Sequence, residues 1–257
     1  MIIEYHRPET MAAALSLLAR PQPLTLPLGG GTTLTQMHDL TCAVVDLQRL
    51  GLDGLNGEGD VITAGAVLTL QGLMDQAGSD TALGRALDLE ASPHQRNRST
   101  LAGRMMTADG RSPLATVMMA MDARLVWLPE GQEVGLAEWF AMREGGRKPG
   151  LLVASLTWSA GMELAFEAVA RTPKDRPIVC AAAARWPSGS IRAVLGGFGN
   201  APMVVYDGLD GHDIVKAARK KYAQAGDAWA SAEYRQEMAG VLMKRCLAAL
   251  EKKEGQA

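Results

Sequence analysis

The chain has 257 residues, of which 47% are hydrophobic and 21% are charged, so it can bury a sizeable core in one to three compact lobes. The 26 lysines and arginines nearly balance the 28 aspartates and glutamates. The resulting net charge of -2 gives no positive footprint for a phosphate backbone or an anionic membrane, which argues against nucleic acid as a partner.

Targeting and metal-binding signals are weak. The opening Met1–Tyr5 lacks a basic region followed by an apolar region, and no apolar run reaches the ~20 residues that span a bilayer. We therefore expect a cytoplasmic protein without membrane insertion. Cys42, Cys180 and Cys246 lie far apart, and no histidine falls at ligand spacing with them, so we expect no iron-sulfur or zinc site in this chain.

Alternating strands and helical turns predict the first lobe, residues 1–58. Its expected elements are a strand at Ile2–Tyr5, a helix at Thr10–Leu18, and strands at Thr25–Leu28 and Ala43–Asp46. A looser patch rich in glycine and polar residues, Gly51–Asp60, separates this lobe from the next, and we place a subdomain boundary there.

Two further lobes are expected at residues 59–160 and 161–257, where the pattern changes from mixed elements to successive strands and then two helices. In the second lobe we expect strands at Val61–Ala66 and Arg124–Leu128, helices at Leu70–Gln76, Ala82–Leu89 and Leu114–Met121, and a polar loop at Ser92–Ser99. The apolar run Leu151–Trp158 closes this lobe. In the third we expect strands at Glu163–Val169, Ile178–Trp186 and Ile191–Leu195, and a last helix at Ala232–Leu250.

A triple glycine directly after a predicted strand is the strongest local signal. Gly29-Gly30-Gly31-Thr32-Thr33 would let backbone amides approach a diphosphate closely, with two hydroxyl groups as further donors. The run matches neither a Walker motif nor the spaced glycines of a Rossmann unit. A tight turn without a ligand explains this segment, taken alone, at least as well.

A second polar segment, Arg96–Asp109, lies between two predicted helices. Its composition alone favours a solvated connection. Together with the glycine run, however, it would form two walls of a cleft suited to an elongated anionic ligand. Phe166, Trp158 and Trp186 are candidates to stack on an aromatic ligand, although buried aromatic residues more often belong to a core.

A third glycine-bearing segment, Leu195–Pro202, is adequately explained as a turn from a strand to a helix. No Gly-x-Ser-x-Gly elbow is present, and no histidine stands out as a base, so we expect no catalytic acid-base residue in this chain.

In this order and at these separations, the segments resemble the flavin subunit of molybdenum hydroxylases, the family of xanthine dehydrogenase and carbon monoxide dehydrogenase. The likeness covers nearly the whole chain. The matching runs are Tyr5-His6-Arg7-Pro8, Gly29–Leu34, Gly65-Ala66, Arg96–Asp109, Met121-Asp122-Ala123, Gly196-Gly197 with Pro202, and Tyr234-Arg235.

The resemblance implies an α+β fold, with a PCMH-type FAD-binding region of two α+β subdomains followed by a C-terminal α/β domain like that of the CO dehydrogenase flavoprotein. It also implies FAD as cofactor, a molybdenum-cofactor large subunit and a 2Fe-2S small subunit as partners, and transfer of electrons from the clusters through FAD to NAD, quinone or oxygen. The implied FAD-binding residues are Leu28, Gly29, Gly30, Gly31, Thr32, Thr33, Leu34, Thr100, Leu101, Ala102, Gly103, Arg104 and Asp109.

The second segment departs from the family pattern. Ser99 stands where the family favours glycine, Ala102 replaces the first glycine of a pair, and Arg104 replaces a smaller asparagine or serine. If Ala102 needs a positive φ, it costs roughly 1 kcal/mol relative to glycine. Two hypotheses therefore stand beside an FAD electron-transfer subunit: a flavin-free subunit that acts as an assembly scaffold, and an unrelated nucleotide-binding protein.

Overall fold

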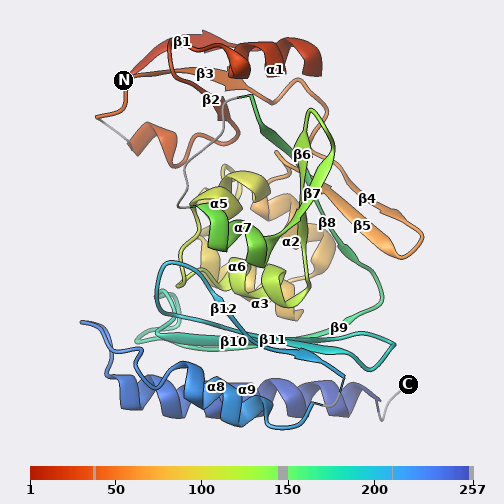
Figure 1. The fold of residues 1–257 in the computed structure, drawn as a ribbon, viewed down its shortest axis with the longest axis vertical. Helices are drawn as coiled ribbons and strands as arrows, with labels where there is room; N and C mark the ends of the chain where they lie inside the picture. Colours follow the sequence, from red (N-terminus) through yellow and green to blue (C-terminus); the bar gives the residue numbers. More distant parts are fainter. Residues whose placement is uncertain (37–38, 144–149, 210, 255–257) are drawn as a thin grey trace. The chain divides into compact units, whose positions relative to one another are not determined.

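The computed structural model describes residues 1–36, 39–143, 150–209 and 211–254, and Figure 1 shows the course of the chain. The chain divides into two compact units. Unit 1 consists of Met1–Leu73, Pro93–Thr107 and Arg124–Trp158, and unit 2 consists of Met74–Ser92, Ala108–Ala123 and Ser159–Ala257. The expected mixture of helices and sheets is present, whereas the division into the three lobes 1–58, 59–160 and 161–257 stays a prediction.

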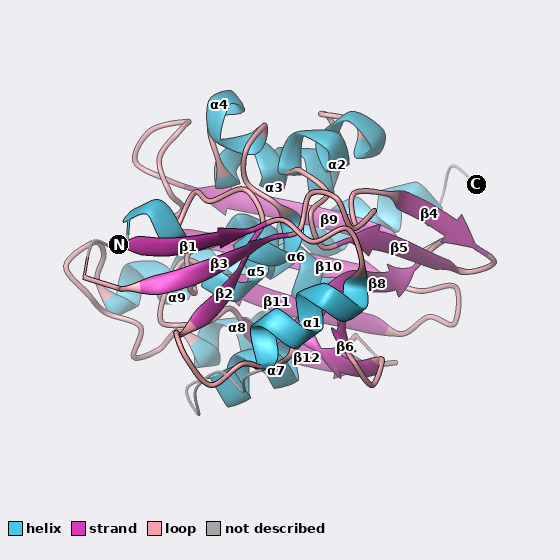
Figure 2. Cartoon of the chain, turned by 90° about the horizontal axis from the view of Figure 1, so that it is seen from above, coloured by secondary structure: helices cyan, strands magenta, loops and turns pink. Residues whose placement is uncertain are grey.

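A three-stranded parallel sheet opens unit 1, with strand order β1-β3-β2. Its elements in chain order are β1 (Ile2–His6), α1 (Met11–Ala19), β2 (Thr25–Leu28) and β3 (Cys42–Asp46). The central strand β3 is buried along its whole length, as its sequence Cys-Ala-Val-Val-Asp requires. Helix α1 begins where Thr10 Oγ1 accepts a hydrogen bond from Ala13 N (3.3 Å), and it packs on β2 and β3 (Figure 2).

A five-stranded sheet forms the rest of unit 1, in the order β4-β5-β8-β6-β7. The strands are β4 (Leu55–Glu58), β5 (Val61–Gly65), β6 (Arg124–Leu128), β7 (Gln132–Gly135) and β8 (Leu152–Ser159). The patch Gly51–Asp60, interpreted from the sequence as a boundary between lobes, contains β4, which pairs with β5 from Leu55 opposite Ala64. Composition does not indicate this edge strand, because it contains Gly57 and most of its side chains are exposed.

Short helices replace two segments that were expected to be loops. The remaining helices up to the end of unit 1 are η1 (Leu34–Gln36), α2 (Leu70–Ala77), α4 (Pro93–Arg96), α5 (Leu101–Thr107) and α7 (Leu136–Met142). The prediction of loops is wrong where α4 and α5 form, whereas most of Ser92–Ser99 is exposed, as its polar composition predicts. Arg96 is an exception, since it is buried and its Nε donates to Gln71 Oε1 at 3.0 Å. A charged residue type does not by itself indicate exposure, because a buried polar group can be satisfied by an internal hydrogen bond.

Unit 2 is built on an antiparallel sheet with the order β12-β11-β10-β9. The strands are β9 (Glu163–Val169), β10 (Val179–Arg185), β11 (Ile191–Gly196) and β12 (Met203–Gly208). The strand-to-helix reading of Leu195–Pro202 is wrong, since this segment joins β11 to β12. Cys180 through Ala184 of β10 are fully buried, and their small side chains let helices approach the sheet closely.

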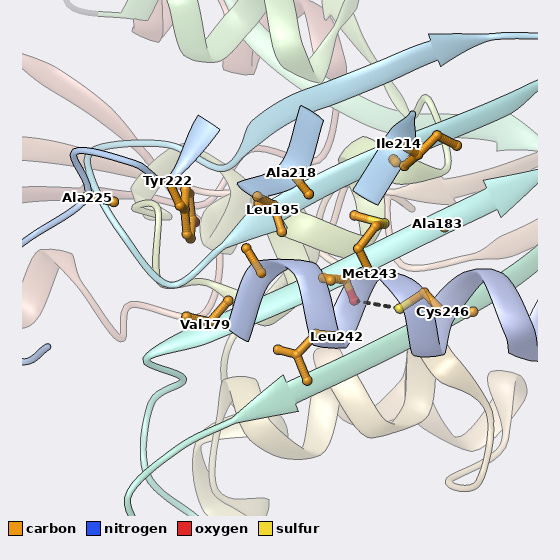
Figure 3. Close-up of a cluster of buried hydrophobic side chains, with 14 of the residues drawn as sticks. Val179, Ala183, Leu195, Ile214, Ala218, Tyr222, Ala225, Leu242, Met243 and Cys246 are labelled. Atoms are coloured by element: carbon orange, nitrogen blue, oxygen red, sulfur yellow. Dashed lines mark hydrogen bonds between the residues drawn. The ribbon is translucent and has the colours of Figure 1, made fainter. Parts of the chain in front are cut away.

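Helices cover this sheet on both faces (Figure 1). They are α3 (Ala82–Glu90), α6 (Pro113–Ala120), α8 (Ile214–Lys221) and α9 (Ala232–Glu254). Figure 3 shows Leu195, Leu242 and Met243 among the side chains buried between the sheet and the last two helices. There, Cys246 Sγ donates to the Ala181 carbonyl at 3.4 Å.

Neither a membrane span nor a metal centre is found among the described residues. No helix in the described ranges has both the length and the apolar character needed to cross a bilayer. Within the same ranges, no three histidine, cysteine, aspartate or glutamate side chains are placed to hold a metal ion. His38 lies outside the described residues.

A fully buried arginine ties the last helix of unit 2 to its surroundings. Arg235 donates through Nε to the Ile178 carbonyl (3.1 Å) and through Nη1 to the Ala225 carbonyl (2.7 Å) and to Asp227 Oδ1 (2.9 Å). Its guanidinium also lies 5.0 Å from the ring centroid of Phe198. A charge with no exposed surface is tolerated only because these acceptors replace water.

We expect Arg235→Leu to lower the free energy of unfolding by about 2–3 kcal/mol, because it leaves the Ile178 and Ala225 carbonyls without their buried donor. Glu237→Ala is the control, since it breaks an exposed pair with Arg219 and should cost less than about 1 kcal/mol. Urea unfolding monitored by circular dichroism gives both values. Equal stability losses in the two variants would contradict the role assigned to Arg235.

The three thiols should resist modification in the folded protein. All three cysteines are buried, and burial raises the pKa of both Cys180 and Cys246 to about 12, so neither forms the reactive thiolate near neutral pH. Titration with Ellman's reagent should therefore detect almost no thiol in the native protein and three per chain in denaturant. Rapid labelling of the native protein would show that these cores open readily.

Candidate functional site

The glycine run follows the carboxyl end of β2, one edge of the parallel sheet in unit 1. The Leu28 carbonyl accepts a hydrogen bond from Leu47 N at 3.1 Å, and this bond holds the end of β2 against the segment after β3. Gly31 adopts a φ of +71°, a conformation that side chains rarely tolerate. Its carbonyl then accepts from both Thr35 N (3.2 Å) and Thr35 Oγ1 (2.7 Å), which starts the turn η1.

The second segment reaches the same place through a short antiparallel bridge. Thr100 pairs with Thr69, the Ser99 carbonyl accepts from Leu70 N (3.0 Å), and Leu101 N donates to the Leu68 carbonyl (2.8 Å). Ala102 N also donates to the Ala66 carbonyl at 3.2 Å. The first turn of α5 is thus fixed to the chain that leaves β5.

The two segments approach each other so closely that glycine is required between them. A Cβ atom on Gly30 would lie 1.5 Å from the Arg98 carbonyl oxygen, and one on Gly29 would lie 2.5 Å from Thr100 Oγ1. Ser99 Oγ donates to Thr32 Oγ1 at 3.3 Å across the same contact. Backbone-to-backbone packing, which only glycine permits here, therefore brings the two predicted walls together.

These segments line a cavity of about 380 Å³ in unit 1, within the range of small-molecule sites. The predicted residues that line it are Gly29, Gly30, Gly31, Thr32, Thr33, Leu34, Thr100, Ala102, Gly103 and Arg104. Apolar walls come from Leu26, Pro27, Leu47, Ala66, Val67, Met106, Leu151, Leu152 and Val153. Most of the predicted set is thus gathered around one cavity.

Three predicted residues do not line this cavity. Leu28 ends β2 just before the glycine run, and Leu101 is fully buried at the start of α5. Asp109 belongs to unit 2, where its carboxylate pairs with Arg176 and accepts from Arg111 N at 2.9 Å. The structure therefore gives Asp109 a local structural partner and does not place it among the cavity residues of unit 1.

Sequence reasoning missed an aromatic pair in the cavity wall. Trp127 on β6 and Trp139 on α7 both line it, with ring centroids 5.1 Å apart and planes inclined by 48°. Their separation along the chain matches no known motif, so no sequence signal pointed to them. The aromatic residues suggested earlier, Phe166, Trp158 and Trp186, are not among the lining residues.

The described cavity lining carries positive charge and no carboxylate. Arg104 and Arg143 contribute guanidinium groups, and Thr32, Thr33 and Thr100 contribute hydroxyl groups. Ala102 does not have the strained positive φ that was considered above. It lies inside α5, and the only non-glycine residues with positive φ in the described ranges are Asp122 and Asp213. This donor set suits a ligand with an anionic centre and apolar rings.

Comparison with known proteins gives the family. A family model described as "FAD binding domain in molybdopterin dehydrogenase" matches residues 1–157. The chain is 26% identical over 249 residues to the uncharacterized protein YgfM of Escherichia coli (strain K12), covering 95% of this chain and 94% of that protein. It is 28% identical over 280 residues to the carbon monoxide dehydrogenase medium chain of Afipia carboxidovorans, covering 95% of each.

The fold agrees with these sequence matches. A chain of the reconstituted CO dehydrogenase from Oligotropha carboxidovorans superposes with a TM-score of 0.80 and 26% identity, covering 97% of both chains. The chain therefore belongs to the family of FAD-binding domains of molybdopterin dehydrogenases. These matches confirm the prediction that the chain is an FAD-binding medium subunit of the molybdenum hydroxylase family. They also confirm the predicted fold class and the predicted cofactor, FAD.

Gly30→Ala should separate the two segments, because the new Cβ cannot coexist with the Arg98 carbonyl. We expect a loss of about 1–3 kcal/mol in unfolding free energy, typical of overpacking, together with weaker FAD retention. Gly135→Ala is the matched control: its φ is -61° and nothing lies within 4 Å of its Cβ position. Thermal unfolding measures the loss of stability, and FAD content after gel filtration measures the loss of cofactor. If Gly30→Ala and Gly135→Ala do not differ in stability or in FAD content, the close approach of Gly30 to the Arg98 carbonyl is refuted.

Proposed function

We propose that this chain is the FAD-binding electron-transfer subunit of a molybdenum hydroxylase complex resembling CO dehydrogenase. The observation that carries the proposal is the single cavity formed by the glycine run and the Thr100–Arg104 segment in a chain of this family. The chain is similar in sequence to a carbon monoxide dehydrogenase medium chain and similar in fold to a chain in a solved structure of CO dehydrogenase. We infer that the partners are a molybdenum-cofactor large subunit and a 2Fe-2S small subunit, and that the complex is cytoplasmic.

The cavity residues divide into two chemical roles. Thr32, Thr33 and Arg104 would hold the diphosphate of FAD, since hydroxyl and guanidinium donors compensate its negative charge. The tryptophan pair and the apolar wall at Leu151–Val153 would contact a ring system. Leu28 and Leu101 would act through the backbone they anchor, and a cofactor-binding role for Asp109 stays a prediction.

When bound, FAD supplies two-electron chemistry that links one-electron iron-sulfur clusters to an acceptor such as NAD, quinone or oxygen. The described cavity lining offers no carboxylate or histidine as an acid or base, which agrees with a chain that holds and orients the cofactor. We therefore infer that substrate oxidation takes place on a partner subunit, and that this chain alone is not a complete enzyme.

The alternative, a flavin-free assembly scaffold, rests on Arg104 filling space that the cofactor needs. The helical conformation of Ala102 removes the strain that had also favoured it. An absorption spectrum of the purified chain decides between the two, with FAD released by acid and measured in the supernatant. One FAD per chain is expected, and a colourless protein that does not take up added FAD would support the scaffold. Family membership sets aside the third hypothesis, an unrelated nucleotide-binding protein.

Charge reversal at Arg104 tests the anion-binding role directly. We expect Arg104→Glu to weaken FAD binding roughly 10-fold or more, because it places a carboxylate beside the proposed site of the diphosphate. Arg104→Lys should retain part of the affinity. Arg124→Glu is the control, since Arg124 pairs with Glu133 on the same sheet and does not line the cavity. Fluorescence titration of the apoprotein gives the dissociation constants. Tighter FAD binding after Arg104→Asn would instead show that the arginine obstructs the site.

A further inference from the structure

A half-exposed tryptophan in unit 2 sits among arginines. Trp229, in the connection between α8 and α9, is 46% exposed, unusually much for so large an apolar side chain. The guanidinium carbons of Arg111 and Arg171 lie over its ring, 4.3 Å and 5.0 Å from the centroid. These residues come from separate segments, so the fold assembles the group. We call Arg111, Arg171, Arg176 and Trp229 the basic tryptophan surface.

The backbone under Trp229 is held by hydrogen bonds around Asp227. Asp227 Oδ1 accepts hydrogen bonds from Trp229 N (2.8 Å) and Ala230 N (3.1 Å), and Asp227 N donates to the Ala230 carbonyl (3.1 Å). The same carboxylate pairs with the fully buried Arg235 at 2.9 Å. The tryptophan is therefore presented on a preorganised turn, so little conformational entropy is lost when a partner binds it.

The arginines are oriented by backbone carbonyls. Arg111 donates through Nε to the Pro177 carbonyl (3.2 Å) and through Nη2 to the Arg176 carbonyl (3.0 Å), and Arg171 donates to the Trp229 carbonyl (3.2 Å). Burial and the nearby charge of Arg176 lower the pKa of Arg111. The guanidinium of Arg111 stays charged near neutral pH, and a bound anion would offset its repulsion with Arg176.

The exposed chemistry selects oxyanions. Two guanidinium groups lie over the indole of Trp229, so part of its ring face is already covered. The rest of the ring stays exposed, and guanidinium groups match the geometry of carboxylates. Asp109, which pairs with Arg176, and Asp175, whose charge acts on Arg111, offset two of the three positive charges of this surface, so one remains in excess.

We propose that the basic tryptophan surface docks a carboxylate-bearing face of a partner subunit, with Trp229 as its anchor. Tryptophan and arginine are the residues that most often dominate the energy of protein interfaces. This proposal rests on the proposed function in one respect, that the chain assembles with other subunits. It requires no role for Trp229 in holding FAD.

The test is assembly of the co-expressed complex, with the chain tagged and both partner subunits followed by gel filtration and mass spectrometry. We expect Trp229→Ala to raise the dissociation constant of the complex roughly 30-fold. The double reversal Arg111→Glu with Arg171→Glu should have a similar effect and remove most of the salt dependence of assembly. Lys244→Glu, a charge reversal on the exposed side of α9, is the control and should assemble normally.

FAD content separates this inference from the proposed function. Trp229→Ala with normal FAD, a normal melting temperature and lost assembly supports the docking surface. Unchanged assembly would overturn it. If the melting temperature also falls, the arginine-tryptophan contacts serve folding alone. If the Michaelis constant for NAD also changes, a small anion is the occupant. A chain that never binds FAD contradicts the proposed function and leaves the assembly result to stand by itself.

Discussion

The close approach of Gly30 to the Arg98 carbonyl is the constraint on which the candidate site depends. A single Cβ atom at position 30 would occupy the space of that oxygen, so the carboxyl end of β2 and the segment before α5 can meet only as backbone against backbone. The contact closes one wall of the cavity and brings Thr32 beside Ser99. A sequence motif would assign Gly30 to ligand binding, but in the structure it lets the glycine run pack against the segment before α5.

The altered residues of the second segment fit the structure without strain. Relative to the family pattern, Ser99 and Ala102 add bulk, yet Ser99 donates a hydrogen bond to Thr32 and Ala102 lies without strain in a helix. Of the three altered residues, Arg104 is the one that lines the cavity with a large side chain. Since the rest of the described lining contains no carboxylate, its charge is compatible with the FAD diphosphate.

Much of the fold was predictable because apolar periodicity reports burial directly. Strands such as Ala43–Asp46 and the last helix follow from that pattern. The edge strand β4 and the helices α4 and α5 were missed because their side chains are polar or mixed, and because buried Arg96 looks like a surface residue until Gln71 is seen beside it. The cavity was predicted through family motifs, whereas Trp127 and Trp139 meet only through the pairing of distant segments, which no local pattern encodes.

Backbone hydrogen exchange of the purified chain with and without FAD tests the central claim most directly. If one cavity binds the cofactor through both segments, FAD should slow exchange in Gly29–Leu34 and in Thr100–Arg104 together, at the same FAD concentration. Protection of only one segment, or protection confined to unit 2, would contradict a site built from the contact between Gly30 and Arg98.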